Sequence, residues 1–159
     1  MTDKSDSVVL ENNFMLFIDV ETTGADVLKH DMLCFAAVII DIKTGKFIDE
    51  FKVYLEPRNG AINWERRCKE EFWYRPDNTE NTKQTLYDLE RYKVPIKLGM
   101  QQFYDWVNKK QSKDVLDNLT IYTDTSGFDI CWINVYLSLA GLFRFTLRSR
   151  GLCHVSPML

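Results

Sequence analysis

The segment 14–24 constrains the fold most, because an apolar, strand-like run ends there in two acidic side chains. The run Phe-Met-Leu-Phe-Ile is followed by Asp19 and Glu21, which stand two positions apart. Side chains alternate along a strand, so both carboxylates are expected on one face of a sheet. Two neighbouring negative charges in a water-poor place are costly unless something positive joins them, and a divalent cation is the natural candidate. The alternative is that the chain simply leaves the core through Thr-Thr-Gly, a turn in which Gly24 would adopt a positive φ.

Composition limits the chain to one domain. Of its 159 residues, 45% are hydrophobic, which is enough for one core and too little for two comfortable domains. No apolar run approaches the roughly 20 residues that span a bilayer, and the polar start lacks a signal-peptide layout. An intracellular, cytoplasmic protein without a membrane partner is therefore expected. The four cysteines show no Cys-x-x-Cys pairing and are expected to be reduced packing residues; they are Cys34, Cys68, Cys131 and Cys153.

The net charge of −3 argues against capture of nucleic acid by a broadly basic surface. An enzyme that grips only a few terminal nucleotides is compatible with this charge, because bound metal ions supply positive charge locally. Three basic clusters, each interpreted as a solvated face rather than a binding track, lie within 66–69, 109–113 and 144–150.

The order of the predicted elements suits a mixed α/β domain. After the first strand, apolar runs at 31–42 and 47–55 flank a Gly-containing turn and predict an antiparallel hairpin. Residues 77–85 are polar and aperiodic, so an exposed loop is expected there. For Trp106 packing is favoured over base stacking. The remaining predicted elements are a helix from 63 to 76, a helix within 99–110, a strand at 119–123 and a helix at 128–141.

Asp129 opens the last predicted helix, 128–141. That helix is apolar nearly all round and is therefore expected in the interior or beneath a covering segment. An acidic residue in the first turn of a helix complements the unpaired N–H groups and the positive end of the dipole, so Asp129 has an ordinary structural explanation. It is also the last acidic residue of the chain.

Two motifs resemble those of a nuclease superfamily. Phe-Ile-Asp-Val-Glu-Thr-Thr-Gly at 17–24 resembles the first motif of the DEDD superfamily of 3′–5′ exonucleases, and Gly-Phe-Asp-Ile-Cys-Trp-Ile-Asn at 127–134 looks like the second. The resemblance implies an α/β, RNase H-like mixed sheet: an antiparallel three-stranded meander, a further strand parallel to the first, and flanking helices, C-terminally incomplete. The expected organisation is an N-terminal tail at 1–13, an exonuclease-like domain at 14–142 and an irregular tail at 143–159.

The same resemblance implies roles for individual residues. Asp19 would bridge two Mg²⁺ or Mn²⁺ ions, Glu21 would ligate the ion that carries the attacking water, and Asp129 would support the second ion. Carboxylates are the hard ligands that Mg²⁺ prefers, and two ions about 4 Å apart stabilise both the nucleophile and the leaving oxygen of a phosphodiester. The substrate-binding residues that the resemblance implies are Thr22, Thr23, Gly24 and Phe128.

The third motif of the superfamily, an Asp preceded four residues earlier by His or Tyr, has no counterpart after Asp129. His154 is followed four positions later by Met158 rather than by Asp. Three explanations stay open: a truncated or alternatively terminated exonuclease, which is favoured, a pseudo-nuclease that keeps the fold for binding, and a chain whose partner subunit supplies the missing groups.

The predicted function is therefore a metal-dependent 3′–5′ exonuclease acting on single-stranded 3′ ends of RNA or DNA, with activity reduced or lost through the missing third motif. The alternative is a catalytically inactive module of the same fold that binds nucleic acid or protein. An incomplete fold would expose apolar sheet surface and an unpaired edge, which makes self-association or binding of a partner subunit a liability of this chain.

Overall fold

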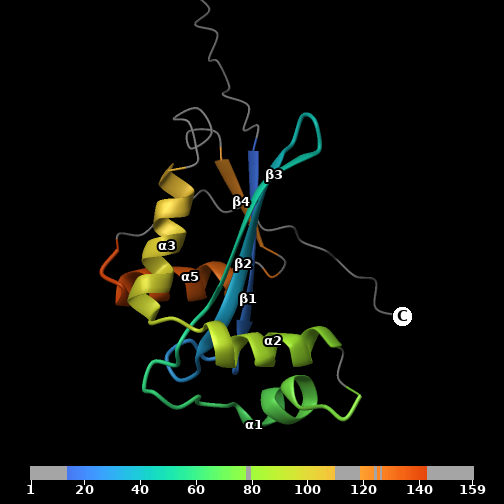
Figure 1. Cartoon of the computed structure of the whole chain (residues 1–159), viewed down its shortest axis with the longest axis vertical. Coiled ribbons are helices and arrows are strands. Elements are labelled where there is room, and N and C mark those ends of the chain that lie inside the picture. Colours follow the sequence, from blue (N-terminus) through green and yellow to red (C-terminus); the bar gives the residue numbers. More distant parts are fainter. Residues whose placement is uncertain (1–13, 78–79, 110–118, 124, 126, 143–159) are drawn as a thin grey trace, which may run out of the picture.

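A mixed four-stranded β-sheet is the centre of the computed structural model, which describes residues 14–77, 80–109, 119–123, 125 and 127–142 (Figure 1). The strands lie in the order β3-β2-β1-β4. Their bounds are β1 Phe14–Thr22, β2 Met32–Asp41, β3 Lys46–Tyr54 and β4 Leu119–Thr123. All four predicted strands are confirmed, as is the RNase H-like arrangement of a meander plus a parallel strand.

β1 has a different neighbour on each side, and one neighbour is short. It pairs with β2 in antiparallel fashion along its length, whereas it pairs with β4 in parallel only as far as Ile18, which lies opposite Thr123. The end of β1 that carries Asp19 and Glu21 therefore lies beyond the end of β4.

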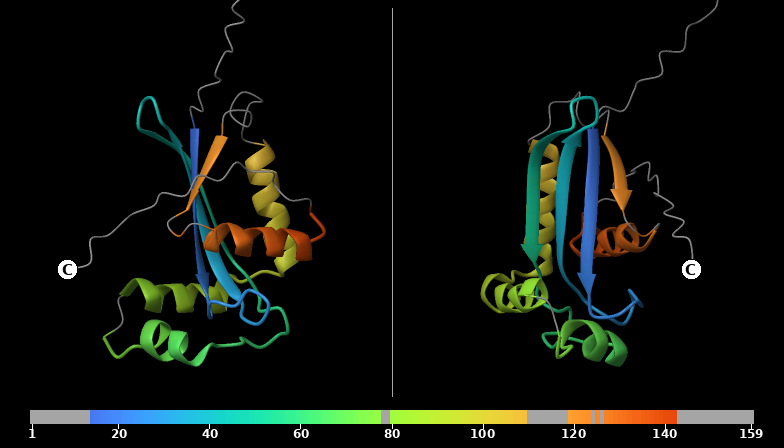
Figure 2. Two further views of the ribbon diagram at one scale, coloured as in Figure 1. Left: turned by 180° about the vertical axis from the view of Figure 1, so that it is seen from behind. Right: turned by 90° about the vertical axis from the view of Figure 1, so that its right-hand side faces the viewer.

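Two helices cover one face of the sheet, and the other helical segments lie beneath one end of it (Figures 1 and 2). The covering helices are α3 Ile96–Lys109 and α5 Phe128–Leu139. The segments beneath the end at which β1 finishes are α1 Arg66–Cys68, the π-helical turn η1 Lys69–Trp73 and α2 Glu80–Tyr92. The helix predicted over 63–76 is thus present in the shorter form of α1 and η1.

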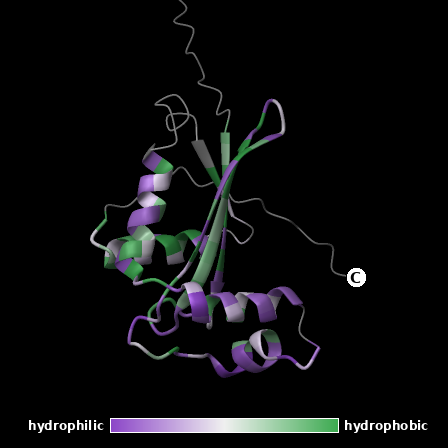
Figure 3. Ribbon diagram, viewed as in Figure 1, coloured by the Kyte–Doolittle hydropathy of each residue, from purple (hydrophilic) through white to green (hydrophobic). Residues whose placement is uncertain are grey.

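Alternation along β1 directs every second side chain of the strand toward α3 and α5. Leu16, Ile18 and Val20 are buried in one cluster with side chains of both helices. In Figure 3 the sheet and α5 are largely hydrophobic, whereas α2 is mostly hydrophilic. Because neighbouring positions on a strand face opposite ways, Asp19 and Glu21 point away from this core. The helical partners in the cluster include Met100, Phe103, Trp106 and Val107 of α3 and Trp132, Ile133, Tyr136 and Leu137 of α5.

α2 is the element that sequence patterning missed, and the exposed loop expected at 77–85 is wrong from Glu80 onward. The helix is mostly polar, and Leu89 is its one buried residue. Its apolar periodicity is therefore weak, and local side-chain bonds support it instead. An example is the hydrogen bond that Gln84 donates to Asp88, one helical turn on, at 2.7 Å.

The other predicted helices are confirmed with shifted ends. α3 begins at Ile96, and Trp106 on it is a packing residue whose ring lies 5.6 Å from that of Phe51 and whose Nε1 donates to Asp49 at 2.8 Å. α5 is interior on one face, while its last residue, Leu139, is 55% exposed. Within the described residues, no helix combines the length and apolarity needed to cross a membrane.

Tyr136 couples α5 to β2, and its hydroxyl provides a test of the fold. This buried hydroxyl accepts a hydrogen bond from the N–H of Met32 at 2.7 Å. Tyr136→Phe removes the acceptor and strands a buried N–H, so the free energy of unfolding is expected to fall by about 1–3 kcal/mol. Urea denaturation measures the change. The control Tyr87→Phe, on an exposed side chain of α2, is expected to change stability by less than about 0.5 kcal/mol; equal effects of the two variants would contradict the coupling.

Candidate functional site

The side chains of Asp19 and Glu21 line a small cavity on the side of the sheet that faces away from α3 and α5. Its volume is about 130 Å³. β2 forms the floor, and α2 contributes a wall. Asp19 is exposed and Glu21 is half-buried, so the pair is reachable from solvent. The residues that line the cavity are Asp19, Glu21, Cys34, Phe35, Ala36, Lys52 and Thr85.

Asp129 reaches the backbone between these two acidic residues. Its carboxylate is 3% exposed, and Oδ1 accepts a hydrogen bond from the N–H of Val20 at 3.1 Å. Val20 separates Asp19 from Glu21 in the chain. The structure therefore brings the three predicted acidic residues to one stretch of β1. Asp129 also lies in the first turn of α5, where its charge complements the helix dipole as expected.

Burial and crowded negative charge raise the pKa of Glu21 from its ordinary value of 4.5 to about 7. Burial is the largest cause, and the Asp19 carboxylate is the next; the Lys52 ammonium lowers the pKa, and the Asp129 carboxylate raises it further. The three carboxylates thus lie within electrostatic range of one another. A cation among them would offset their repulsion.

The donor chemistry fits a hard divalent cation. Asp19 and Glu21 supply two carboxylates on one face of β1, and adjoining solvent can complete the coordination of an ion such as Mg²⁺. In the described part of the chain, no group of three His, Cys, Asp or Glu side chains stands at metal-binding spacing. One oxygen of Asp129 is bound instead to the Val20 backbone. Asp19 and Glu21 are therefore the residues that would hold an ion, with Asp129 behind them.

Thr23 is a buried residue whose hydrogen bonds fix the loop after β1. It is fully buried, and its N–H donates to the Asp31 carbonyl at 2.8 Å. Its hydroxyl donates to the Asn63 carbonyl at 2.6 Å and accepts from the Asp31 N–H at 2.8 Å. Its own carbonyl accepts from the N–H of Glu65. These bonds give Thr23 an internal role, and its contact with a nucleotide stays a prediction.

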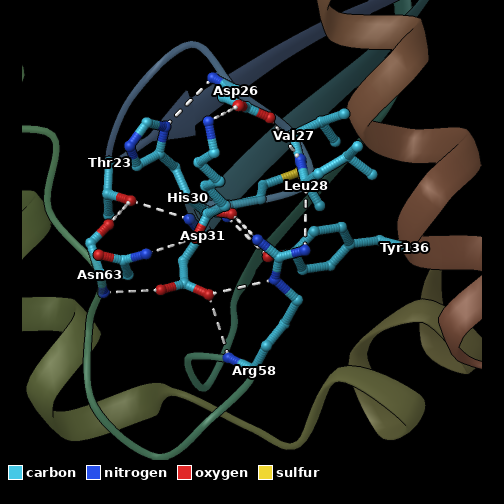
Figure 4. Close-up of polar contacts among 11 residues, drawn as sticks. Thr23, Asp26, Val27, Leu28, His30, Asp31, Arg58, Asn63 and Tyr136 are labelled. Atoms are coloured by element: carbon cyan, nitrogen blue, oxygen red, sulfur yellow. Dashed lines mark hydrogen bonds and ion pairs between the residues drawn. The ribbon is translucent and has the colours of Figure 1, made fainter.

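A buried ion pair fastens the same loop to the segment that follows β3 (Figure 4). The Asp31 carboxylate accepts from the backbone N–H groups of Arg58 at 3.1 Å and Asn63 at 2.9 Å, and pairs with the Arg58 guanidinium at 3.4 Å. Arg58 also donates to the His30 carbonyl and lies 5.9 Å from the centre of the Tyr136 ring. The loop that leaves the acidic strand is thus connected to both a second loop and α5.

Gly24 is required by close packing, and it does not use the positive φ that the alternative interpretation left open to it. A Cβ at this position would lie 2.5 Å from the Cβ of Glu65 and 2.5 Å from Nδ1 of His30. The neighbouring Thr22 carbonyl accepts a hydrogen bond from Nε1 of Trp73 at 2.9 Å. The end of β1 is therefore packed against η1 and the chain before it, while contact of Thr22 and Gly24 with a nucleotide stays a prediction.

Phe128 stands next to Asp129 and is half-buried. Its ring packs edge-on against Trp132, with the ring centres 6.1 Å apart. This contact anchors the first turn of α5 in the core. A contact of Phe128 with substrate stays a prediction.

Of the cavity-lining residues that were not predicted, Lys52 and Thr85 carry the polar side chains that come from β3 and α2. Lys52 lies on β3 opposite Ala36, which in turn lies opposite Asp19, so the strand register would have revealed it. Thr85 lies on α2, which has no strong sequence pattern.

Comparison with known proteins identifies the fold by structure alone. No protein-family model and no curated protein sequence matches the chain. Among solved structures, the nuclease domain of 3′hExo, a DEDDh family member bound to rAMP, is 16% identical with a TM-score of 0.58, over 86% of this chain and 64% of that one. Cell-death related nuclease 4 (CRN-4) is 18% identical with a TM-score of 0.54, over 82% and 41%. The zinc-bound E. coli ExoI–ssDNA complex is 12% identical with a TM-score of 0.62, over 88% and 27%.

These likenesses show that the chain has the fold of DEDD-superfamily 3′–5′ exonucleases, as its two motifs predicted. The chain spans less than two thirds of the length of each of these proteins. The identities are low, so the likeness concerns the fold and leaves activity to be argued from the site.

Removing one partner of the buried ion pair is expected to weaken the fold strongly. Asp31→Ala leaves the Arg58 guanidinium, 17% exposed in the folded chain, without its carboxylate. The free energy of unfolding is expected to fall by about 3 kcal/mol, measured by urea denaturation. The matched control Asp77→Ala breaks an exposed pair with Arg75 and is expected to cost less than about 1 kcal/mol. Similar losses in the two variants would refute the role of the buried pair.

Glu21 is expected to make stability fall as pH rises. Between 4.5 and about 7 the folded chain holds a proton on Glu21 that the unfolded chain has lost, so the free energy of unfolding declines across this window. Glu21→Gln removes the titration and is expected to stabilise the chain above pH 7 by about 1 kcal/mol after solvent screening, with little difference at pH 4. Denaturation with EDTA at both pH values measures the effect, and an equal difference at both would contradict it.

Proposed function

We propose that this chain is a divalent-metal-dependent 3′–5′ exonuclease that removes nucleotides from single-stranded ends of RNA or DNA. The observation that carries the proposal is the acidic pair Asp19 and Glu21 in a solvent-reachable cavity, with Asp129 bound to the backbone between them. The fold supports it, because the neighbours described above include nuclease structures with rAMP and with ssDNA.

The chemistry assigned to this site is hydrolysis of the terminal phosphodiester. Water attacks phosphorus, the bond from phosphorus to the 3′ oxygen of the penultimate nucleotide breaks, and that oxygen takes up a proton. The products are a nucleoside 5′-monophosphate and a strand shortened by one nucleotide. Mg²⁺ or Mn²⁺, when bound, supplies positive charge that stabilises the oxygens of the reacting phosphate.

The protein residues hold the parts of this reaction in place. Asp19 and Glu21 would hold the ion, and Asp129 keeps β1 and the start of α5 together while adding negative charge. Thr22 and Gly24, at the end of the strand, and Phe128, at the start of α5, border the same stretch and are proposed to position the terminal nucleotide. Backbone and phosphate contacts of this kind fix position without reading sequence.

A second candidate function is a non-catalytic module of the same fold that binds nucleic acid. The observation that favours it is the lack of a three-ligand metal group within the described residues. Such a module would bind oligonucleotides equally well with and without a divalent ion.

The exonuclease proposal is tested by following 5′-labelled single strands of RNA and DNA with the full chain in Mn²⁺. Stepwise shortening from the 3′ end is expected, and Asp19→Asn is expected to slow it by at least about 100-fold, because a lost metal ligand removes several kcal/mol of charge stabilisation. The matched control Asp77→Asn changes an exposed carboxylate on the loop before α2 and is expected to keep full activity.

A second measurement separates binding of the ion from contamination by another nuclease. Mn²⁺ is expected to raise the melting temperature of the wild-type chain and of Asp77→Asn, but not that of Asp19→Asn, because an ion that binds only the folded state stabilises it. The exonuclease proposal would be refuted, and the binding module favoured, if wild type and Asp19→Asn shortened strands at the same rate and if Mn²⁺ left the melting temperature of the wild type unchanged.

A further inference from the structure

We propose that Lys52 is a substrate-binding residue whose ammonium group contacts a phosphate of the strand that enters the Asp19–Glu21 cavity. The inference deepens the proposed function and rests on it for the nature of the substrate. It arises from three observations: the register of the sheet, the support beneath the Lys52 side chain and the balance of charge in the cavity.

The register places Lys52 in line with the acidic pair. Asp19 of β1 lies opposite Ala36 of β2, and Ala36 lies opposite Lys52 of β3. Directly opposed residues share a face of a sheet, so the three side chains form a row across three strands. Adjacent strands are about 4.8 Å apart, which puts the Asp19 and Lys52 backbones about 10 Å from each other. The methyl group of Ala36 leaves the space between them open.

The next row provides support for the Lys52 side chain. Glu21, Cys34 and Tyr54 lie opposite one another in the same way. The Lys52 ammonium lies 4.9 Å from the centre of the Tyr54 ring, a cation–π contact, and the Tyr54 hydroxyl donates to Asp88 of α2 at 2.8 Å. Tyr54 is thus fixed at both ends, by the sheet and by α2, and it holds the ammonium beside the cavity.

The Lys52 ammonium lies close to the acidic pair and is available to an anion. Its side chain lines the same cavity as Asp19 and Glu21. Among the described residues, however, Lys52 forms no ion pair with a carboxylate; its ammonium rests on the Tyr54 ring instead. A phosphate that bridges a metal ion on Asp19 and Glu21 to the Lys52 ammonium would satisfy both partners. A Lys ammonium is a compact charge well suited to this contact.

The test measures binding of a 5′-fluorescein-labelled trinucleotide to the full chain in Ca²⁺ by fluorescence anisotropy. Lys52→Gln is expected to weaken binding about tenfold, the value of one charged hydrogen bond. It is also expected to reduce the slope of log K against log salt by about 0.7, the contribution of one phosphate contact in a single strand. Lys52→Arg keeps the charge and is expected to retain most of the affinity.

The matched control is Lys46→Gln, which makes the same change in charge at the start of the same strand, about 20 Å away. It is expected to bind as the wild type does. Urea denaturation of all variants confirms that each is folded. Equal affinity and salt slope for Lys52→Gln and Lys46→Gln would overturn the assignment, since a Lys52 that only offsets nearby acidic charge would alter stability and leave the salt slope unchanged.

The same variants distinguish failure of this inference from failure of the proposed function. If wild type shortens strands in Mn²⁺ while Lys52→Gln keeps the KM of Lys46→Gln, the exonuclease stands and the role of Lys52 is refuted. If wild type and Asp19→Asn both leave strands intact while Lys52→Gln still loses affinity and salt slope, the exonuclease proposal fails and Lys52 is confirmed as a phosphate contact of a binding module.

Discussion

One hydrogen bond, from the N–H of Val20 to the Asp129 carboxylate, connects the architecture of the sheet to its acidic site. β4 stops opposite Ile18, so a backbone donor farther along β1 lacks a strand partner on that side and needs another acceptor. Asp129 supplies it from the first turn of α5. Asp129 therefore satisfies a backbone N–H group and also brings a third carboxylate close to Asp19 and Glu21. The fold and the candidate site depend on the same contact.

The two faces of the β-sheet differ in role: one packs against helices, and the other carries the candidate site. Apolar positions of β1 meet α3 and α5, which leaves the alternate positions, including the acidic pair, for the opposite face. Buried contacts also fix the loops that follow β1 and β3. The buried pair of Asp31 and Arg58 ties the chain after β1 to the chain after β3, and Trp73 holds the last carbonyl of β1. The Asp129–Val20 hydrogen bond and these loop contacts together keep the repelling carboxylates close.

The helices and strands that were predicted from the sequence are those with strong apolar patterns. The four strands, α3 and α5 carry dense or periodic apolar runs, so these elements could be predicted from patterns. The arrangement of the sheet and the grouping of the three carboxylates were predicted from the resemblance of two motifs to the DEDD superfamily. α2 could not be predicted, because it buries only Leu89 and depends on polar contacts. The packing role of Gly24 could not be predicted, because the close approach of Glu65 and His30 depends on the tertiary structure. Lys52 was overlooked because its row depends on cross-strand register, which no single strand reveals.

The residue on the floor of the cavity controls the space between two opposite charges. Ala36 is the neutral residue between an acid on one neighbouring strand and a base on the other, and its side chain points away from the core. A bulkier residue at 36 would narrow the gap between the opposite charges while leaving both of them, and the hydrophobic packing beneath, in place. The size of the side chain at position 36 therefore sets the space between Asp19 and Lys52 without altering either charged group.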